Sequence, residues 1–389
     1  MGKTRAGAAR QSLSPESPNP VVLDLMPFDP DRFENVHQVG GIQTGSLDHP
    51  QPNGGQGCRV AFVDTGAGLR FTVNLDRGGD IVAATYKDIS LAFHTPNGYK
   101  PPNPAYHRDE DWLEGWPGGL VTTCGPEYIG PPRVEDGRLV SLHGRYSNTP
   151  AAIDMIHDPE PRAGRTEMLL SMIIRDSRFY GPVFKVRRQI QCQLGEPMLT
   201  IYDEVTNRSD LPVAHHWLYH CNFGYPLLDE GAKFIYKGTV TPWQPEDVRP
   251  SLSAIQKLKT VSAPRDDRRG GLSDAIFIDD SEPAEDGLRH VGLINTKRKL
   301  GVELSWPANV LPRLANWQHL GPMGAYVSAL EPFSGSLRGK HEDDHPAAEQ
   351  YLQPGQTRRY RLHIRVHEGT AAINALKKHD GPLELAEGR

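Results

Sequence analysis

Short segments with β-strand character, separated by strong turn signals, recur along most of this 389-residue sequence. Between residues 58 and 95, the runs CRVAFVD, LRFTVNL, DIVAATY and ISLAFHT alternate with the turn signals DTGAG, DRGG and KD. Runs of Val, Ile, Phe and Thr at hairpin spacing predict antiparallel strands. Similar runs return at 167–226 and 289–369. The pattern predicts an all-β fold, a large antiparallel β-sandwich with few short helices.

The even spacing of the strands and the lack of a strong linker predict a single domain over residues 21–380. The basic, proline-bearing residues 1–20 are expected to be a disordered tail, and residues 381–389 a C-terminal tail. The charged stretch 245–287 is poor in large hydrophobic residues and is the expected insertion, with a short helix near 253–259. A further helix is expected over 370–378.

A passage dense in glycine and proline, residues 96–132, contains Trp112 and Trp116. Loops this long in a compact domain are usually functional or disordered, and the aromatic content argues against disorder. We expect this passage to fold over a site.

The charge balance and the cysteines narrow the class of protein. The 43 basic and 48 acidic residues give a net charge of −5, which offers no general attraction for nucleic acid or an anionic membrane. The four cysteines form no CxxC pair and residues 1–20 lack the apolar centre of a secretory signal, so we expect a cytoplasmic protein. Its expected partner is a small, neutral molecule, and the expected state is a monomer or homodimer.

Three histidines interrupt the hydrophobic run at 214–231, AHHWLYHCNFGYPLLDEG. In an extended strand, His216, His220 and Asn222 share one face with Leu218, while Trp217, Tyr219 and Cys221 share the other. One face therefore suits a core and the other a ligand. The alternative is a strand whose imidazoles are hydrogen-bonded for structural reasons.

A second polar group of side chains is predicted in SLHGRYSNTPA, residues 141–151. In an extended segment His143, Arg145 and Ser147 project the same way, and Gly144 lets backbone or ligand come close. This arrangement suits a hydroxyl-rich ligand. The alternative is that Arg145 pairs with an acid and His143 caps a turn.

A third polar position, Glu331, follows small residues in GAYVSALEPFSG, residues 324–335. Glutamates are rarely buried without a reason, so a carboxylate above small neighbours suggests a site, although it also fits the solvated end of a strand. Nearby, Trp317 is suited to stacking on a sugar face and Gln318 to hydrogen bonding. Two histidines and a glutamate suit acid/base catalysis or a metal site.

Three motifs occur in an order that resembles the aldose 1-epimerases, also called galactose mutarotases. They are LHGR at His143, YHCNFGYPLL around His220 and ALEP at Glu331. The segments RGGDI, GGLVTTCG and HGRYSNTPA are similar to the divergent bacterial branch of these proteins named DUF4432. The resemblance spans roughly Val60 to Val366.

The resemblance implies a β-super-sandwich with an open sugar groove, in which sugar anomers interconvert by acid/base ring opening without a cofactor or a metal. By motif, Glu331 resembles the base that takes the anomeric hydroxyl proton, and His220 the acid that protonates the ring oxygen. His143 resembles the second histidine, which binds and polarises the sugar. The catalytic strand departs from the family pattern, since it reads YHCNFG in place of NHTYFNL.

An asparagine–arginine pair of the better-studied members has no clear counterpart here, and Arg77 with Asp80, or Arg145, is expected to take its place. The full set of predicted substrate-binding residues is Arg77, Asp80, Arg145, Asn222, Trp317 and Gln318.

Two other functions stay open at this point. One is an isomerase or lyase acting on an oxidised keto sugar, in which His216, His220 and His143 could hold a divalent metal. The other is a non-catalytic carbohydrate-binding protein that uses Trp317, Trp112 and Trp116 as stacking platforms. The mutarotase roles predict a bell-shaped pH profile, with Glu331 on its acid limb and His220 on its alkaline limb.

Overall fold

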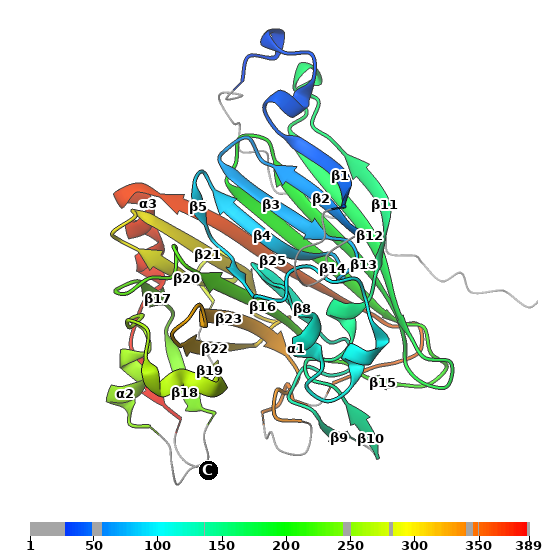
Figure 1. The fold of residues 1–389 in the computed structure, drawn as a ribbon, viewed down its shortest axis with the longest axis vertical. Coiled ribbons are helices and arrows are strands. Elements are labelled where there is room, and N and C mark those ends of the chain that lie inside the picture. The colour runs from blue at the N-terminus through cyan, green and yellow to red at the C-terminus, as the bar shows by residue number, and fades with distance from the viewer. Residues whose placement is uncertain are drawn as a thin grey trace, which may run out of the picture.

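A computed structural model describes residues 28–48, 57–135, 137–243, 250–279, 283–339, 345–348 and 350–386. The predicted N-terminal tail, residues 1–20, lies outside these ranges. Two large sheets form the body of the described chain, in agreement with the predicted β-sandwich (Figure 1).

The first sheet has 12 strands in the order β1-β2-β3-β4-β8-β16-β23-β22-β19-β18-β26, with β5 paired to β4. Its strands are β1 (Gly41–Leu47), β2 (Cys58–Asp64), β3 (Leu69–Asn74), β4 (Asp80–Tyr86), β5 (Ile89–Ser90), β8 (Val121–Cys124), β16 (Trp217–Gly224), β18 (Gly238–Pro242), β19 (Asp274–Asp279), β22 (Arg313–Leu320), β23 (Tyr326–Ser334) and β26 (Leu383–Leu385).

The second sheet has 8 strands in the order β11-β12-β13-β14-β25-β21-β20-β17. Its strands are β11 (Ala151–His157), β12 (Glu167–Ser177), β13 (Val183–Gln193), β14 (Met198–Asn207), β17 (Lys233–Ile235), β20 (Leu288–Asn295), β21 (Leu300–Pro307) and β25 (Thr357–Glu368). Short pairs outside the two sheets are β6 (Phe93–His94) with β7 (Gly118–Gly119), β9 (Arg133–Glu135) with β10 (Arg138–Val140), and β15 (Val213–Ala214) with β24 (Tyr351–Leu352).

Helices are few and short, as predicted. The α-helices are α1 (Trp112–Gly115), α2 (Leu252–Lys257) and α3 (Gly369–Leu376). The 3-10 helices are η1 (Pro30–Arg32), η2 (Val36–Gln38), η3 (Pro104–His107), η4 (Tyr146–Asn148), η5 (Pro161–Ala163), η7 (Asp266–Gly271) and η8 (Lys377–His379). The helices expected near 253–259 and over 370–378 correspond to α2 and to α3 with η8.

The core forms between the two sheets because alternate residues of their strands point inward. Val73 and Val121 of the first sheet belong to the same buried apolar cluster as Met172, Val186 and Ile364 of the second. Strands with one buried face read as alternating apolar and polar residues, as β13 and β25 do. The remaining face of the first sheet is therefore free to carry polar groups.

A buried arginine joins the two sheets across this core. Arg188 on β13 donates to both carboxylate oxygens of Asp203, at 2.9 and 2.7 Å, and to Asp80 Oδ1 on β4, at 3.1 Å. Its Nη2 atom also donates to Thr123 Oγ1 at 2.8 Å. A buried guanidinium is tolerated when its charge is paired and its donors are used, as they are here.

The expected insertion and the expected C-terminal tail both pack against the sandwich. Ile255 of α2 and the nearby Val261, both within the expected insertion, belong to the main buried cluster. In the expected C-terminal tail, β26 pairs in parallel with β18. Among the described residues, no helix is both long enough and apolar enough to cross a bilayer.

Candidate active site

The two faces of β16 divide as the sequence predicts. Trp217, Tyr219 and Cys221 are buried in the main apolar cluster between the sheets. Leu218 belongs to a separate cluster on the other side of the strand. His220 alternates with the core residues and therefore lies on the outer face of the first sheet, as expected for a ligand-facing position.

The central feature of this outer face is the pair His220 and Glu331. The antiparallel register of β16 and β23 joins Leu218 to Phe333 and Cys221 to Leu330, which places His220 opposite Glu331. His220 Nε2 lies 3.3 Å from Glu331 Oε1, and the two side chains are 7% and 5% exposed. Two titratable groups that are 111 residues apart in sequence thus meet across neighbouring strands.

Aromatic rings surround the imidazole of His220. The ring of Trp317, on β22, lies edge-on with its centroid 5.7 Å away, and that of Trp116 lies at 6.0 Å. The His143 ring is 5.6 Å from His220, and the Trp112 ring is 4.8 Å from His143. Such a set of flat apolar rings next to polar groups suits the alternating apolar and hydroxyl surfaces of a sugar.

The passage 96–132 approaches the pair as predicted. Figure 1 shows α1 at the end of β8 and β16. The Trp116 indole donates to Thr122 Oγ1 at 3.0 Å, and the Trp112 indole donates to Ser147 Oγ at 2.9 Å. Each buried indole N–H is thereby satisfied, and the two rings stack at 5.5 Å in fixed positions beside the histidines. Thr122 was missing from the predicted site residues, and Trp116 was predicted as part of the cover and as a stacking platform in the carbohydrate-binding alternative.

His143 reaches the site from a turn and not from the extended segment that the sequence predicts. Its φ is 57°, the φ of Gly144 is 74°, and η4 follows at Tyr146. A Cβ at Gly144 would lie 2.4 Å from the backbone oxygen of Tyr128, so glycine is required there. The His143 Nδ1 atom lies 2.8 Å from the Ile129 carbonyl oxygen. This contact fixes the orientation of the ring, so that Nε2 is the ring nitrogen with which a ligand could interact.

Burial shifts the pKa values of Glu331 and His220 in directions that do not fit the base and acid roles expected from sequence. Desolvation raises the pKa of Glu331 to about 8, because the ionised carboxylate loses water. Desolvation, together with the neighbouring His143, lowers the pKa of His220 to about 3. Desolvation likewise lowers the pKa of His143 to about 4. Between about pH 3 and pH 8, the His220–Glu331 pair of the ligand-free chain therefore holds one titratable proton. This proton resides on the Glu331 carboxyl group.

Several buried polar atoms at the site have no hydrogen-bond partner among the described residues. They are His220 Nδ1, Glu331 Oε1 and Asn222 Oδ1, although Glu331 Oε1 is in ion-pair range of His220 and the Asn222 side chain is close enough to His220 to act against the lowering of its pKa. Asn222 Nδ2 donates to the His220 backbone oxygen at 2.9 Å, so its amide is oriented. Unpaired buried polar groups in a folded protein often mark a place where a ligand completes the bonding.

Two of the predicted substrate-binding residues hold the fold together. The Asp80 carboxylate accepts from Arg188 and from the Thr123 backbone N–H at 3.0 Å, inside the core between the sheets. The Arg145 Nε atom lies 3.4 Å from Asp176 Oδ1, which agrees with the structural alternative for this arginine. Both side chains contact groups more than 30 residues away in sequence, so no local sequence pattern could predict these contacts.

Gln318 differs from the prediction because adjacent residues of a strand face opposite ways. While Trp317 points toward His220, the Gln318 amide donates to Leu258 O and to Asn316 Oδ1, both at 2.7 Å. Gln318 therefore lies on the face away from the catalytic pair. Arg77 is fully buried and donates to Asn148 Oδ1 at 2.9 Å, and burial lowers its pKa to about 10. Its Nε atom has no hydrogen-bond partner in the described part of the chain.

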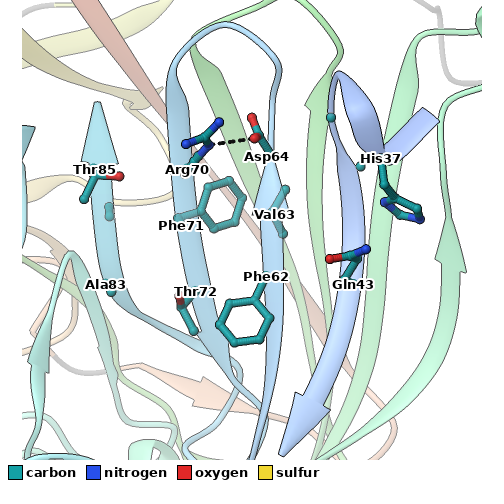
Figure 2. Close-up of a pocket in the computed structure, with 13 residues that line it drawn as sticks. His37, Gln43, Phe62, Val63, Asp64, Arg70, Phe71, Thr72, Ala83 and Thr85 are labelled. Atoms are coloured by element: carbon teal, nitrogen blue, oxygen red, sulfur yellow. Dashed lines mark hydrogen bonds and ion pairs between the residues drawn. The ribbon is translucent and has the colours of Figure 1, made fainter. Parts of the chain in front are cut away.

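Of the three histidines considered for a metal, His143 and His220 lie side by side, whereas His216 is held by a separate contact. His216 Nδ1 accepts from the Ser336 backbone N–H at 3.1 Å, at the start of β16. Within the described ranges, the side chains that could jointly hold an ion are His290 and Glu303 of the second sheet and His379 of η8. A hollow over β1 to β4 contains an Asp64–Arg70 ion pair and the rings of Phe62 and Phe71, and none of the predicted catalytic residues lines it (Figure 2).

The sequence matches the family described as a domain of unknown function, DUF4432, over residues 55–366. No curated protein matches the chain. Among solved structures, a Klebsiella pneumoniae protein provisionally described as an aldose 1-epimerase is 21% identical, with 91% of this chain and 94% of that chain covered and a TM-score of 0.76.

Two galactose mutarotase-like proteins show a more distant likeness. The one from Clostridium acetobutylicum is 10% identical, with 85% of this chain and 99% of that chain covered and a TM-score of 0.59. The one from Lactobacillus casei is 12% identical, with 79% and 100% covered and a TM-score of 0.51. At these identities the likeness establishes the galactose mutarotase-like β-sandwich fold, and the chemistry has to be argued from the site.

Proposed function

Because this chain belongs to the DUF4432 family and has the galactose mutarotase-like fold, we propose that it is an aldose 1-epimerase-like isomerase that interconverts the anomers of a sugar. The observation that carries the proposal is the buried His220–Glu331 pair, 3.3 Å apart and bordered by aromatic rings. Mutarotation requires one group that takes a proton from the anomeric hydroxyl and one that gives a proton to the ring oxygen.

The proton count of the pair suits this reaction. One group gives up a proton as the other gains one, so a pair holding one proton in total returns to the same state after each ring opening and closure. In the free protein that proton resides on Glu331, because burial favours the neutral forms of both groups. We therefore assign the protonated Glu331 as the acid and the neutral His220 as the base for ring opening, with the roles exchanged on closure. This reverses the roles expected from sequence.

The neighbouring side chains have separate tasks in the proposal. His143, fixed through Nδ1 by the Ile129 carbonyl, presents its other nitrogen to a sugar oxygen. Trp317 and Trp116 pack against the apolar face of the ring. Asn222 and Arg77 are retained as substrate-binding candidates, because each has a buried polar atom without a hydrogen-bond partner among the described residues. The reaction uses no cofactor and no metal.

Anomer exchange measured by polarimetry or NMR on a panel of aldoses tests the proposal. We expect the full chain to accelerate exchange for at least one sugar, and Glu331→Gln and His220→Asn to abolish most of that acceleration. Gln318→Ala is the matched control, because Gln318 belongs to the adjacent strand β22 and faces away from the pair. Equal exchange rates for the parent chain and Glu331→Gln would overturn the assignment.

A second candidate function rests on the raised pKa of Glu331. A carboxylate with a pKa of about 8 is a stronger base than an ordinary glutamate, and abstraction of a carbon-bound proton next to a sugar carbonyl requires such a base. This reaction is an isomerisation of a keto sugar. NMR in D₂O distinguishes the two functions, since only the second exchanges a carbon-bound hydrogen for deuterium.

A further inference from the structure

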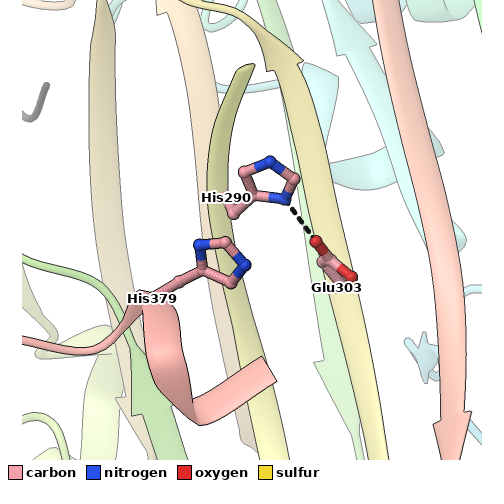
Figure 3. A group of neighbouring side chains, drawn as sticks. All are labelled: His290, Glu303 and His379. Atoms are coloured by element: carbon pink, nitrogen blue, oxygen red, sulfur yellow. Dashed lines mark hydrogen bonds and ion pairs between the residues drawn. The ribbon is translucent and has the colours of Figure 1, made fainter. Parts of the chain in front are cut away.

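A second group of imidazoles and carboxylates lies on the eight-stranded sheet, outside the proposed catalytic site. It comprises His290 on β20, Glu303 on β21 and His379 in η8, and one ligand atom from each lies within 4.8 Å of the others. Val291, Val302 and Leu304, their neighbours along the strands, point into the core, so His290 and Glu303 lie on the outer face of the sheet. Figure 3 shows the His379 ring beside the His290–Glu303 pair.

The packing of α3 against this face brings His379 to the other two residues. Ile373 and Leu376 of the helix pack with Ile235 and Ile294 of the sheet. A Cβ at Gly292 or Gly301 would lie 3.1 or 3.3 Å from Leu376 Cδ2, so two glycines allow the helix to approach closely. Three residues after Leu376, the His379 ring stacks on His290, with 4.2 Å between centroids and 14° between planes.

Outer partners hold His290 and Glu303 from their far sides. His290 Nδ1 faces Glu303 Oε1 at 2.5 Å, while Asp286 Oδ2 lies 3.0 Å from the other ring nitrogen. Glu303 Oε2 in turn lies 2.5 Å from His367 Nε2. Metal ligands in proteins have this arrangement, since a carboxylate on the far nitrogen orients an imidazole and a hydrogen bond on the second oxygen orients a carboxylate.

We propose that His290, Glu303 and His379 bind a divalent transition-metal ion such as Zn²⁺, and that the ion fastens the C-terminal segment to the eight-stranded sheet. Two imidazoles and one carboxylate form a ligand set that Zn²⁺ accepts, with water available as a fourth ligand. The three donor atoms lie within 4.8 Å of one another, and His290 Nδ1 and Glu303 Oε1 are 2.5 Å apart. Zn–N and Zn–O bonds of about 2.0–2.2 Å therefore require side-chain rotations that separate this pair and admit the ion between it and His379.

The position of the ion suggests a structural role. After His379, the chain continues to β26, which pairs with β18 of the other sheet. Between them, Asp380 forms an ion pair with Lys259, which also donates to the Gly381 backbone oxygen at 3.0 Å. An ion at His379 would anchor the start of a segment that connects both sheets. Because the ion would bind the folded chain and not the unfolded chain, it would raise the free energy of unfolding.

The test uses the full chain, purified without a histidine tag and stripped with a chelator. Calorimetric titration with Zn²⁺ is expected to show one ion per chain, and Zn²⁺ is expected to raise the melting temperature. His379→Ala should weaken the affinity at least tenfold and remove most of the rise in melting temperature. His157→Ala is the control, because His157 is an exposed histidine of the same sheet and should leave both measurements unchanged.

Two further variants keep the result interpretable. Glu303→Gln preserves the shape of the ligand and removes its charge, and it should weaken Zn²⁺ binding as His379→Ala does. His220→Asn should bind Zn²⁺ as the parent chain does. The proposal is wrong if the parent chain takes up no Zn²⁺, if His379→Ala binds it equally tightly, or if His220→Asn abolishes binding.

Discussion

His220–Glu331 and His290–Glu303 are pairs of the same two residue types, one on each sheet, yet their surroundings shift their pKa values in opposite directions. Burial raises the pKa of Glu331 to about 8 and lowers that of His220 to about 3. Glu303 is also desolvated, but hydrogen bonds from His290 and His367 outweigh this and lower its pKa to about 2. Contacts with Glu303 and Asp286 outweigh the desolvation of His290 and raise its pKa.

The number of partners explains this difference. Glu331 has His220 at 3.3 Å as its one ion-pair partner among the described residues, without hydrogen-bond geometry. Glu303 has an imidazole on each oxygen, at 2.5 Å in both cases. A histidine–glutamate pair is therefore a salt bridge where additional partners stabilise the charges, and a neutral, proton-sharing pair where burial dominates. The first arrangement suits structure or metal binding, and the second suits catalysis.

The largest expected effect separates the two pairs by activity. Glu331→Gln should lower kcat for anomer exchange by about 10²–10⁴-fold with little change in KM, because a proton-transfer group is lost. Glu303→Gln should leave kcat within about twofold, since this carboxylate lies on the other sheet. Both rates are measured by NMR exchange spectroscopy. A loss of kcat in both variants would indicate a general defect in folding and contradict the comparison.

The next expected effect is a difference in the pH dependence of stability. Because the folded chain binds a proton at Glu331 more tightly than the unfolded chain does, stability present below pH 4.5 is lost as the pH rises to about 8. At roughly 1.4 kcal/mol per pKa unit, the loss is roughly 5 kcal/mol. Denaturant unfolding of the parent chain and Glu331→Gln at each pH measures it. If the difference between the two stays constant from pH 5 to pH 9, Glu331 is not neutral in the folded chain.

Glu303 should show the opposite slope with a smaller amplitude. Its folded pKa of about 2 lies below the ordinary 4.5, so its contribution is present above pH 4.5 and is lost as the pH falls toward 2. Glu303→Gln should lower the free energy of unfolding at pH 7 by about 2 kcal/mol, as expected for loss of hydrogen bonds to a charged group. In the same unfolding series, the difference between this variant and the parent chain should shrink steadily as the pH falls from 4.5 to about 2.

The smallest expected effect concerns the aromatic border of the catalytic pair. Trp317→Ala should raise KM about tenfold, because stacking of a ring on an apolar surface contributes of the order of 1 kcal/mol beyond its buried area. Gln318→Ala should leave KM unchanged and lower stability, since Gln318 supports Leu258 and Asn316. Steady-state kinetics and thermal unfolding of both variants measure this. A change in KM for Gln318→Ala alone would reverse the assignment of the two faces.

The fold and the central pair were predictable because they depend on local patterns. Strand runs and turn signals predicted the sandwich, and the alternation in β16 predicted the outward face of His220. Motif order placed Glu331 with it. The same alternation, applied to β22, would have shown that Trp317 and Gln318 cannot share a face.

The other differences arise from distant contacts or from turn geometry. Asp80 is engaged by Arg188, 108 residues along the chain, and Arg145 by Asp176 on β12. His143 adopts a positive φ of 57°, which is rare for a non-glycine residue. No sequence motif predicts this turn conformation. The proposed acid and base roles depend on burial, and the depth of a carboxyl group is set by the packing of both sheets and the tryptophan cover.

The short strand β26 also protects the protein against self-association. Residues 383–385 cover one side of β18, whose backbone N–H and C=O groups would otherwise form an open edge of the 12-stranded sheet. Open edges offer a template for strands of other molecules, whereas a short outermost strand such as β26 offers little. Truncating the chain so that it ends before residue 383 would remove β26 and therefore expose an aggregation-prone edge. A fusion partner is better attached after residue 386 than in place of this strand.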